Sequence, residues 1–283
     1  MSFLPTIYLI DNGSLRPEAT LALRDLAAAL SRRTCYEVEA VSLLHSSKVP
    51  AEDLGGVPAK TFKKTLARAI QAGERRFICL PMFLGPSRAI TEYLPELIEA
   101  AQEDTPYLQV EIADPLAGAD VSNPDIRLAE ILARQIDGCF GVAGWSRPAV
   151  ALVDHGTPYE PVNMLRNRVA EQLGEILGDR VSAVVASSME RRDGAEYDFN
   201  EPLLERLGQL EVLQGSSKLI AAMFFLLPGR HAGEGGDVAG ICEGLVSSGS
   251  FEAIQRTELL GQDPQLLDIL SDRLLAAIKK LPS

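Results

Sequence analysis

Two of the three histidines in the chain, His155 and His231, each follow an apolar segment of strand length. Neutral imidazole is the commonest nitrogen ligand of borderline divalent metals, and it also accepts a proton near pH 7. Two such rings at one place could therefore hold a metal ion and take up protons from a ligand. The third histidine, His45, has no counterpart in the other half of the chain, and we interpret it as structural.

Short segments of the two halves resemble each other at nearly one spacing. Residues 10–14 (IDNGS) correspond to residues 153–157 (VDHGT), 143 positions later, and residues 86–92 correspond to residues 228–234, 142 positions later. Two matches at nearly the same offset indicate an internal duplication. At the two matched turns the second half carries the histidines, whereas the first half carries Asn12 and Ala89. Because only the second half has the pair, we expect function to reside there.

Apolar runs of strand length alternate with amphipathic stretches of helix length. The pairs are 6–10 with 17–32, 76–83 with 91–102, 149–153 with 158–177, and 218–227 with 239–248. Strands that are apolar throughout are typical of a parallel sheet covered by helices on both faces, so the predicted fold class is α/β.

The Gly-containing polar stretch 138–148 is the predicted linker between two domains. We therefore expect an N-terminal module, 1–143, that lacks the histidine pair, and a C-terminal module, 144–283, that carries it. A chain of 283 residues is long enough for two domains of moderate size.

The matched turns are expected at the carboxyl edge of a parallel sheet, where α/β proteins build their sites. Thr157 and Glu160 have the spacing of a capping box, which predicts a helix that begins directly after the His155 turn. Ser14 is expected to cap the matching helix in the first half. Since the ends of parallel strands share one edge, we expect His155 and His231 to lie together.

Composition argues against several classes of partner. The formal net charge of −12 disfavours binding to nucleic acid or to an anionic membrane surface through a basic face. No apolar run approaches the roughly 20 residues of a membrane helix, and the first ten residues lack the pattern of a signal peptide. We therefore expect a cytoplasmic protein with a small-molecule substrate. Four widely spaced cysteines form no zinc or redox motif: Cys35, Cys79, Cys139 and Cys242.

Other α/β functions lack their motifs. The chain has no G-x-G-x-x-G turn after a strand, no G-x-x-x-x-G-K-[ST] loop and no G-x-S-x-G turn. Dinucleotide binding, P-loop nucleotide hydrolysis and serine hydrolase chemistry are accordingly disfavoured, and no organic cofactor is expected.

Residues 154–157 (DHGT) and 224–231 (FFLLPGRH) resemble the two histidine turns of the CbiX-type sirohydrochlorin cobaltochelatases and ferrochelatases, also called class II chelatases. The resemblance spans the chain as two chelatase-like, flavodoxin-like modules. It implies ATP-independent insertion of Co²⁺ or Fe²⁺ into sirohydrochlorin, as in cobalamin and siroheme biosynthesis. It further implies that His155 and His231 are the metal ligands and proton acceptors.

Glu190, which follows the apolar run 181–186, resembles the acidic residue that some members of this family carry at the end of the intervening strand. It is a candidate third ligand or proton relay, with a solvated surface glutamate as the alternative, and Glu196 and Glu201 compete for this role. After His231 the chain departs from the family pattern, because an insertion replaces the usual acid and proline and Asp237 takes the place of that acid. This altered loop leaves the identity of the tetrapyrrole open.

Several arginines could bind the carboxylates of a tetrapyrrole despite the acidic composition. The candidates are Arg88, Arg166, Arg168, Arg191, Arg192 and Arg230.

Three functions stay open from the sequence. The first is the chelatase, with Co²⁺, Fe²⁺ and Ni²⁺ all compatible with imidazole ligands. The second is a non-catalytic metal or tetrapyrrole carrier, and the third is a structural partner subunit that needs neither histidine. We expect a monomer in which the two modules form an internal pseudo-dimer.

Overall fold

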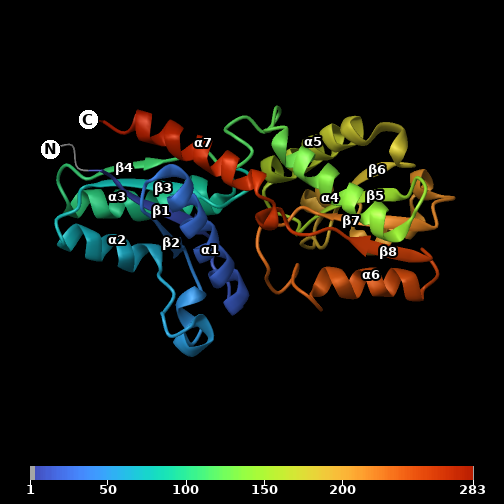
Figure 1. Ribbon diagram of the computed structural model, residues 1–283, viewed down its shortest axis with the longest axis horizontal. Coiled ribbons are helices and arrows are strands. Elements are labelled where there is room, and N and C mark those ends of the chain that lie inside the picture. The colour runs from blue at the N-terminus through green and yellow to red at the C-terminus, as the bar shows by residue number, and fades with distance from the viewer. Residues whose placement is uncertain (1–3, 283) are drawn as a thin grey trace. The chain divides into compact units, whose positions relative to one another are not determined.

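The computed structural model describes residues 4–282, apart from the side chains of residues 141–143. Its strands form two four-stranded sheets in which all neighbours pair in parallel (Figure 1). The first sheet has the order β2-β1-β3-β4 and the second the order β6-β5-β7-β8, so the two repeat one topology. The predicted α/β class and duplication are thereby confirmed.

The strands begin and end close to the predicted apolar runs. They are β1 (Thr6–Asp11), β2 (Val38–Ser42), β3 (Arg76–Pro81), β4 (Gln109–Ile112), β5 (Ala149–Asp154), β6 (Val184–Ser188), β7 (Lys218–Met223) and β8 (Ala253–Arg256). The α-helices are α1 (Pro17–Thr34), α2 (Phe62–Gln71), α3 (Leu94–Asp104), α4 (Arg127–Ala143), α5 (Glu160–Leu177), α6 (Asp237–Ser247) and α7 (Gln265–Lys280). Within residues 4–282, none of these helices has the length and apolar character of a membrane span.

The predicted linker 138–148 is wrong in its first half, because α4 continues through Gly138 to Ala143. Buried side chains at Ile131, Leu132 and Ile136 hold this helix against its unit, and one internal glycine costs a helix only about 1 kcal/mol. The helix ends where Gly144 adopts the left-handed conformation and its N–H binds the carbonyl of Phe140.

The chain forms two compact units whose limits differ from the sequence modules 1–143 and 144–283. The first unit comprises residues 1–119 and 266–283, and the second comprises residues 120–265. Each unit therefore contains the helix that follows the last strand of the other: α7 follows β8 but belongs to the first unit, and α4 follows β4 but belongs to the second.

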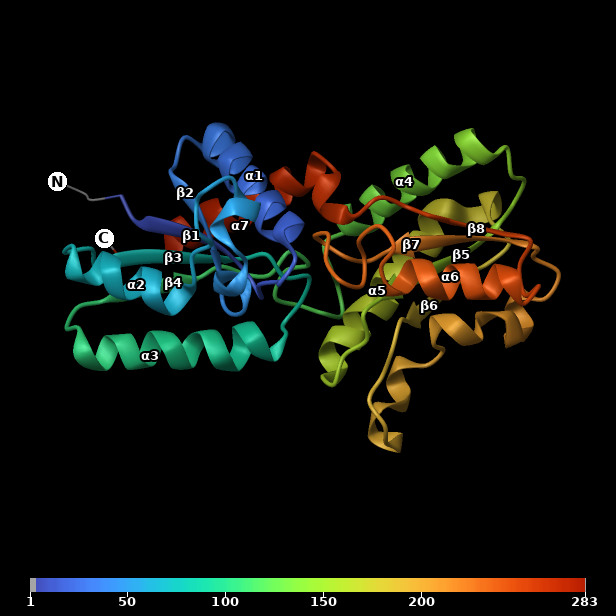
Figure 2. The same ribbon diagram turned by 90° about the horizontal axis from the view of Figure 1, so that it is seen from below.

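In the first unit, helices cover both faces of the sheet (Figure 2). Tyr8 and Ile10 of β1 pack with side chains of α2 and α3, among them Phe62 and Leu94. Residues of β1 at the alternate positions face α1, because successive side chains of a strand point to opposite faces. Helix α7 is tied to this unit by Arg273, which donates to the carbonyls of residues 115 and 116.

The second unit buries one sheet face under α6 and the 3₁₀ helix η6 (Leu204–Gln209). Alanines on β5 and β7, including Ala151 and Ala221, give this face little volume, so the side chains of Leu204 and Leu207 approach the sheet closely. Helices α4 and α5 pack against each other and against the sheet strands β7 and β5.

Substitution of one leucine in each exchanged helix tests these unit limits. Leu274 of α7 and Leu132 of α4 are both fully buried, so each change to alanine should cost about 2 to 5 kcal/mol. Different cooperative units of a protein open separately, and amide hydrogen exchange reports each opening. Leu274→Ala should therefore speed exchange in β1–β4, and Leu132→Ala should speed exchange in β5–β8. The reverse pattern, with Leu274→Ala loosening β5–β8, would show that the sequence modules and not these units are the cooperative bodies.

Candidate metal-handling site

The carboxyl ends of three neighbouring strands bring the predicted site residues together. Glu190 follows β6, His155 follows the central strand β5, and His231 lies in the loop after β7. The imidazole centroids of the two histidines are 4.5 Å apart with their planes at 71°. Glu190 Oε1 lies 3.4 Å from Nε2 of His155. The histidines therefore lie together, as their shared sheet edge predicts.

Both imidazole rings are oriented through Nδ1. His155 Nδ1 lies 3.0 Å from the carbonyl oxygen of Gly156, and His231 Nδ1 lies 2.7 Å from Oδ2 of Asp237. Carbonyl and carboxylate oxygens accept hydrogen bonds, so Nδ1 is the donor in each contact, and in the neutral ring Nε2 then keeps its lone pair. Metal-bound histidines are commonly held by such outer hydrogen bonds, which fix the tautomer and ring direction.

The site is open to solvent. The side chains of His155 and His231 are 46% and 30% exposed, and that of Glu190 is 59% exposed. Among residues 4–282, no group of three or more His, Cys, Asp or Glu side chains is arranged to hold a metal ion. The donors that meet at this edge of the sheet are the two imidazoles, with the carboxylate of Glu190 beside that of His155.

The His155 turn requires glycine at its second position. Gly156 has φ +91°, and a Cβ there would lie 1.9 Å from the carbonyl oxygen of Glu190. Its first-half counterpart Gly13 has φ +90° and would place a Cβ 1.8 Å from the carbonyl oxygen of Leu44. The two halves therefore build the same close approach between neighbouring strand ends, which only glycine allows.

The predicted capping box and the predicted cap at Ser14 are both wrong, since α1 begins after Arg16 and that N-cap makes no side-chain hydrogen bond either. Helix α5 begins at Glu160 with Tyr159 as N-cap, and that cap makes no side-chain hydrogen bond. The Thr157 hydroxyl instead accepts from the N–H of Tyr159 at 3.0 Å, and Ser14 accepts from Arg16 at 3.0 Å. Each hydroxyl thus accepts from the N–H two residues later, and that residue directly precedes the first residue of the helix.

The loop after β7 brings Asp237 to His231, so the acid expected to replace the family residue does contact the histidine. Asp237 is the first residue of α6, and the N–H of Val238 donates to the carbonyl of His231. A Cβ on Gly236 would lie 2.7 Å from the carbonyl oxygens of both Arg230 and His231. The extra glycines of this loop thus allow the start of α6 to reach the histidine.

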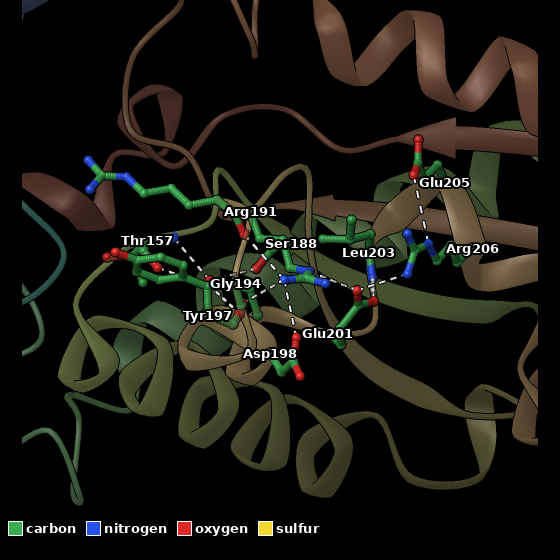
Figure 3. Close-up of polar contacts among 12 residues, drawn as sticks. Thr157, Ser188, Arg191, Gly194, Tyr197, Asp198, Glu201, Leu203, Glu205 and Arg206 are labelled. Carbon is green, nitrogen blue, oxygen red and sulfur yellow. Dashed lines mark hydrogen bonds and ion pairs between the residues drawn. The ribbon is translucent and has the colours of Figure 1, made fainter.

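The two acids that compete with Glu190 have other surroundings. Glu201 forms ion pairs with Arg191 and Arg206, each at 3.0 Å, and accepts from the N–H of Leu203 (Figure 3). Glu196 lies against Gly194, in the 3₁₀ helix Ala195–Asn200. Glu190 is therefore the acid that the structure places beside His155.

The arginines singled out from the sequence have differing environments. Arg166 is only 1% exposed, so it is neither a candidate for binding substrate carboxylates nor a solvated surface charge. Arg191 lies between Asp198 and Glu201 in Figure 3, and Arg192 lies over the ring of Tyr197. Arg88 and Arg168 form ion pairs within their own helical segments. Arg230 is 76% exposed and lies 3.6 Å from Asp237 beside the histidines.

A buried aspartate precedes the matched turn in each half, but the two have different partners. Burial raises the pKa of Asp154, while Arg166, the Ser188 hydroxyl and the Gly156 N–H act in the opposite direction. In the first half, burial raises the pKa of Asp11 to about 6, and one of its carboxylate oxygens has no hydrogen-bond partner. The residue that matches Arg166 there is Leu23, which is buried.

Asp11→Asn should stabilise the protein at neutral pH, because a carboxyl whose folded pKa lies above its unfolded pKa is penalised once it ionises. The carboxyl binds more protons folded than unfolded between about pH 4 and pH 6, so stability falls as the pH rises through that window. The gain from Asn should be at most about 3 kcal/mol near pH 7 and should vanish below about pH 4. Urea unfolding across this range measures it, with Asp25→Asn on the exposed face of α1 as control. A gain that does not depend on pH would contradict the assignment.

The CbiX family model matches residues 6–137 of the chain, ending inside α4. The match covers the module that lacks the histidine pair, and it confirms the resemblance that the sequence motifs indicate. No curated protein matches the chain in sequence.

Solved chelatase structures share the fold over nearly the whole chain. SirB from Bacillus subtilis with Fe³⁺ aligns with a TM-score of 0.72 at 13% identity, covering 98% of this chain and 96% of its own. SirB from Bacillus subtilis subspecies spizizenii with cobalt aligns with a TM-score of 0.69 at 11% identity, covering 98% and 97%. CbiX, described as the terminal enzyme of siroheme biosynthesis in denitrifying bacteria, aligns with a TM-score of 0.61 at 15% identity, covering 96% and 99%. At these identities the likeness establishes the two-unit fold.

Proposed function

We propose that this protein inserts a divalent metal, Co²⁺ or Fe²⁺, into sirohydrochlorin without ATP. The observation that carries the proposal is the pair His155 and His231, with ring centroids 4.5 Å apart and both Nδ1 atoms engaged, which leaves the Nε2 atoms as the nitrogens that would bind the ion. The CbiX family match and the fold shared with SirB and CbiX point to the same reaction.

In this mechanism the imidazoles of His155 and His231 replace water ligands of the ion and present it to the ring. Metal insertion exchanges one divalent ion for two pyrrole protons, so two protons must leave the macrocycle for each ion that enters. Glu190, 3.4 Å from His155 and exposed to solvent, is placed to receive these protons and release them to water. Neither step consumes ATP, and the described residues contain no P-loop sequence.

Both histidine side chains reach solvent, at 46% and 30% exposed, so an ion held by their imidazoles stays accessible to the nitrogens of the macrocycle. Imidazole and carboxylate ligands accept Co²⁺, Fe²⁺ and Ni²⁺ alike, and availability then selects among them.

A non-catalytic metal or tetrapyrrole carrier is the second candidate. The observation in its favour is the loop after His231, where glycines at residues 233, 235 and 236 stand in place of the acid and proline that the family usually carries there. A carrier binds one equivalent of metal and stops, whereas a chelatase releases product and continues.

Replacement of both histidines tests the chelatase directly. Anaerobic absorbance spectra of sirohydrochlorin with excess Co²⁺ or Fe²⁺ should show multiple turnovers with the natural protein. We expect His155→Ala/His231→Ala to fall to the uncatalysed rate, because this variant lacks both nitrogen ligands.

His45→Ala is the matched control, since it removes the remaining histidine in the other unit and should leave the rate unchanged. Equal rates for the natural protein and the double variant would overturn the mechanism. A single equivalent of metal taken up without turnover would establish the carrier.

Glu190→Gln separates a proton relay from a metal ligand. Glutamine keeps the size of the side chain but cannot take up a proton at neutral pH, so kcat should fall about 10- to 100-fold while Co²⁺ affinity stays nearly unchanged. Glu196→Gln, which alters an exposed acid in the following 3₁₀ helix, should change neither quantity. A parallel loss of Co²⁺ affinity and rate in Glu190→Gln would instead make Glu190 a ligand.

A further inference from the structure

Asn200 is a fully buried amide that joins the His155 turn to the segment after β6. Its side chain is 0% exposed and makes hydrogen bonds through both of its polar atoms. Its Oδ1 accepts from the N–H of Thr157 at 3.0 Å, and its Nδ2 donates to the carbonyls of Thr157 at 2.9 Å and Tyr197 at 3.1 Å. Buried polar side chains with this degree of satisfaction hold a unique local geometry.

The hydrogen bond to Thr157 fixes the peptide that orients His155. The N–H of Thr157 and the C=O of Gly156 belong to one peptide group, which is planar. Asn200 holds this group by its N–H, while His155 Nδ1 donates to its carbonyl oxygen at 3.0 Å. Rotation of this plane would remove the acceptor of His155, so the direction of its imidazole depends on Asn200.

The Glu190 carboxylate competes with the Gly156 carbonyl for the ring proton of His155, and it lies farther from the ring, at 3.4 Å against 3.0 Å. The Nε2 of His155 faces Glu190, and the ring of His231 lies 4.5 Å away between centroids. With the side chain 46% exposed, surrounding packing restrains the ring only in part. The carbonyl of Gly156 is therefore the contact that holds the proton on Nδ1.

The first half provides an internal comparison. The N–H of Ser188 donates to the carbonyl of Pro202, and the N–H of Ser42 donates to the carbonyl of Lys60, which aligns these two segments. Two residues earlier, the position of Asn200 is matched by Pro58, whose side chain has no hydrogen-bonding atom. The half with Asn12 in place of the histidine thus lacks this side-chain link.

We propose that Asn200 is a positioning residue that holds the Gly156–Thr157 peptide plane and thereby keeps His155 in the Nδ1–H tautomer with Nε2 toward the metal. Its role in metal transfer rests on the proposed chelatase function, whereas its effect on the tautomer does not. Outer hydrogen-bond partners of metal-binding histidines typically change metal affinity by about 10- to 100-fold, and a loss of Co²⁺ affinity in this range is expected for Asn200→Leu.

Nitrogen-15 NMR of the histidine rings tests the proposal, and the chain has only three histidines to assign. At about pH 8.5, above the ordinary histidine pKa, the natural protein should show His155 and His231 as Nδ1–H tautomers. Asn200→Leu should convert His155 to a mixture of tautomers and leave His231, which is held by Asp237, unchanged. Asn200→Asp, which keeps an acceptor for the Thr157 N–H, should retain the Nδ1–H form of His155.

Asn163→Leu is the matched control, because Asn163 is an equally buried asparagine in the same unit that contacts Asn167 rather than the turn. This variant should leave the tautomers of His155 and His231 unchanged, even if it lowers the melting temperature. An Nε2–H tautomer of His155 in the natural protein would overturn the proposal, and this measurement requires no variant to fold. An unchanged His155 tautomer in folded Asn200→Leu would also overturn it.

Cobalt titration and sirohydrochlorin turnover separate this proposal from the chelatase. If the tautomer changes and Co²⁺ affinity falls about tenfold or more while no variant or natural protein turns over sirohydrochlorin, Asn200 positions His155 but the chelatase assignment fails. If turnover is normal in the natural protein and in Asn200→Leu, the positioning role is wrong and the chelatase stands.

Discussion

Parallel pairing of β5 between β6 and β7 is the constraint on which the rest of the site depends. Asp154 at the end of β5 pairs with Ser188 of β6, and Val153 pairs with Met223 of β7. Backbone hydrogen bonds continue past the strand ends, from Met189 to Asp154 and from Phe224 to Val153. Because the three strands end at one level, the loops that leave them must begin side by side.

The loops then bring their side chains into contact by different means. The turn after β5 is short and needs glycine, since Gly156 approaches the backbone of Glu190 too closely for any side chain. The loop after β7 is longer, and its position depends on the start of α6, where Asp237 meets His231. Thus one histidine is held by a neutral peptide carbonyl and the other by a carboxylate. The two imidazoles are therefore oriented by acceptors of different charge.

The first half shows what the fold requires without the chemistry. It keeps Asp11, Gly13 and the serine turn, and its Gly13 approaches Leu44 just as Gly156 approaches Glu190. At the positions of the two histidines it carries Asn12 and Ala89, and at the position of the acid it carries Leu44. Burial raises the pKa of Asp11 and of Asp154, but only Asp154 has a buried arginine, Arg166, that acts in the opposite direction. The turn is therefore a property of the fold that does not depend on the histidines.

Local sequence determined much of this protein. Apolar runs of strand length indicated the parallel class, and Asp-His-Gly-Thr identified the turn after β5, because both depend on neighbours along the chain. Matching short segments 142 and 143 positions apart indicated the duplication, since each segment is itself local. Sequence also singled out Glu190 and Asp237, though not their contacts.

Only the tertiary structure decided which helix belongs to which unit, since α4 and α7 pack on the opposite unit to the one their preceding strands build, and no local pattern records a partner so distant in the chain. It alone placed Arg166 in the core and Arg191 between two acids, because the burial of a charged side chain depends on what surrounds it. Asn200 was missed for the same reason: a single asparagine 43 residues from Thr157 carries no signal until folding joins them.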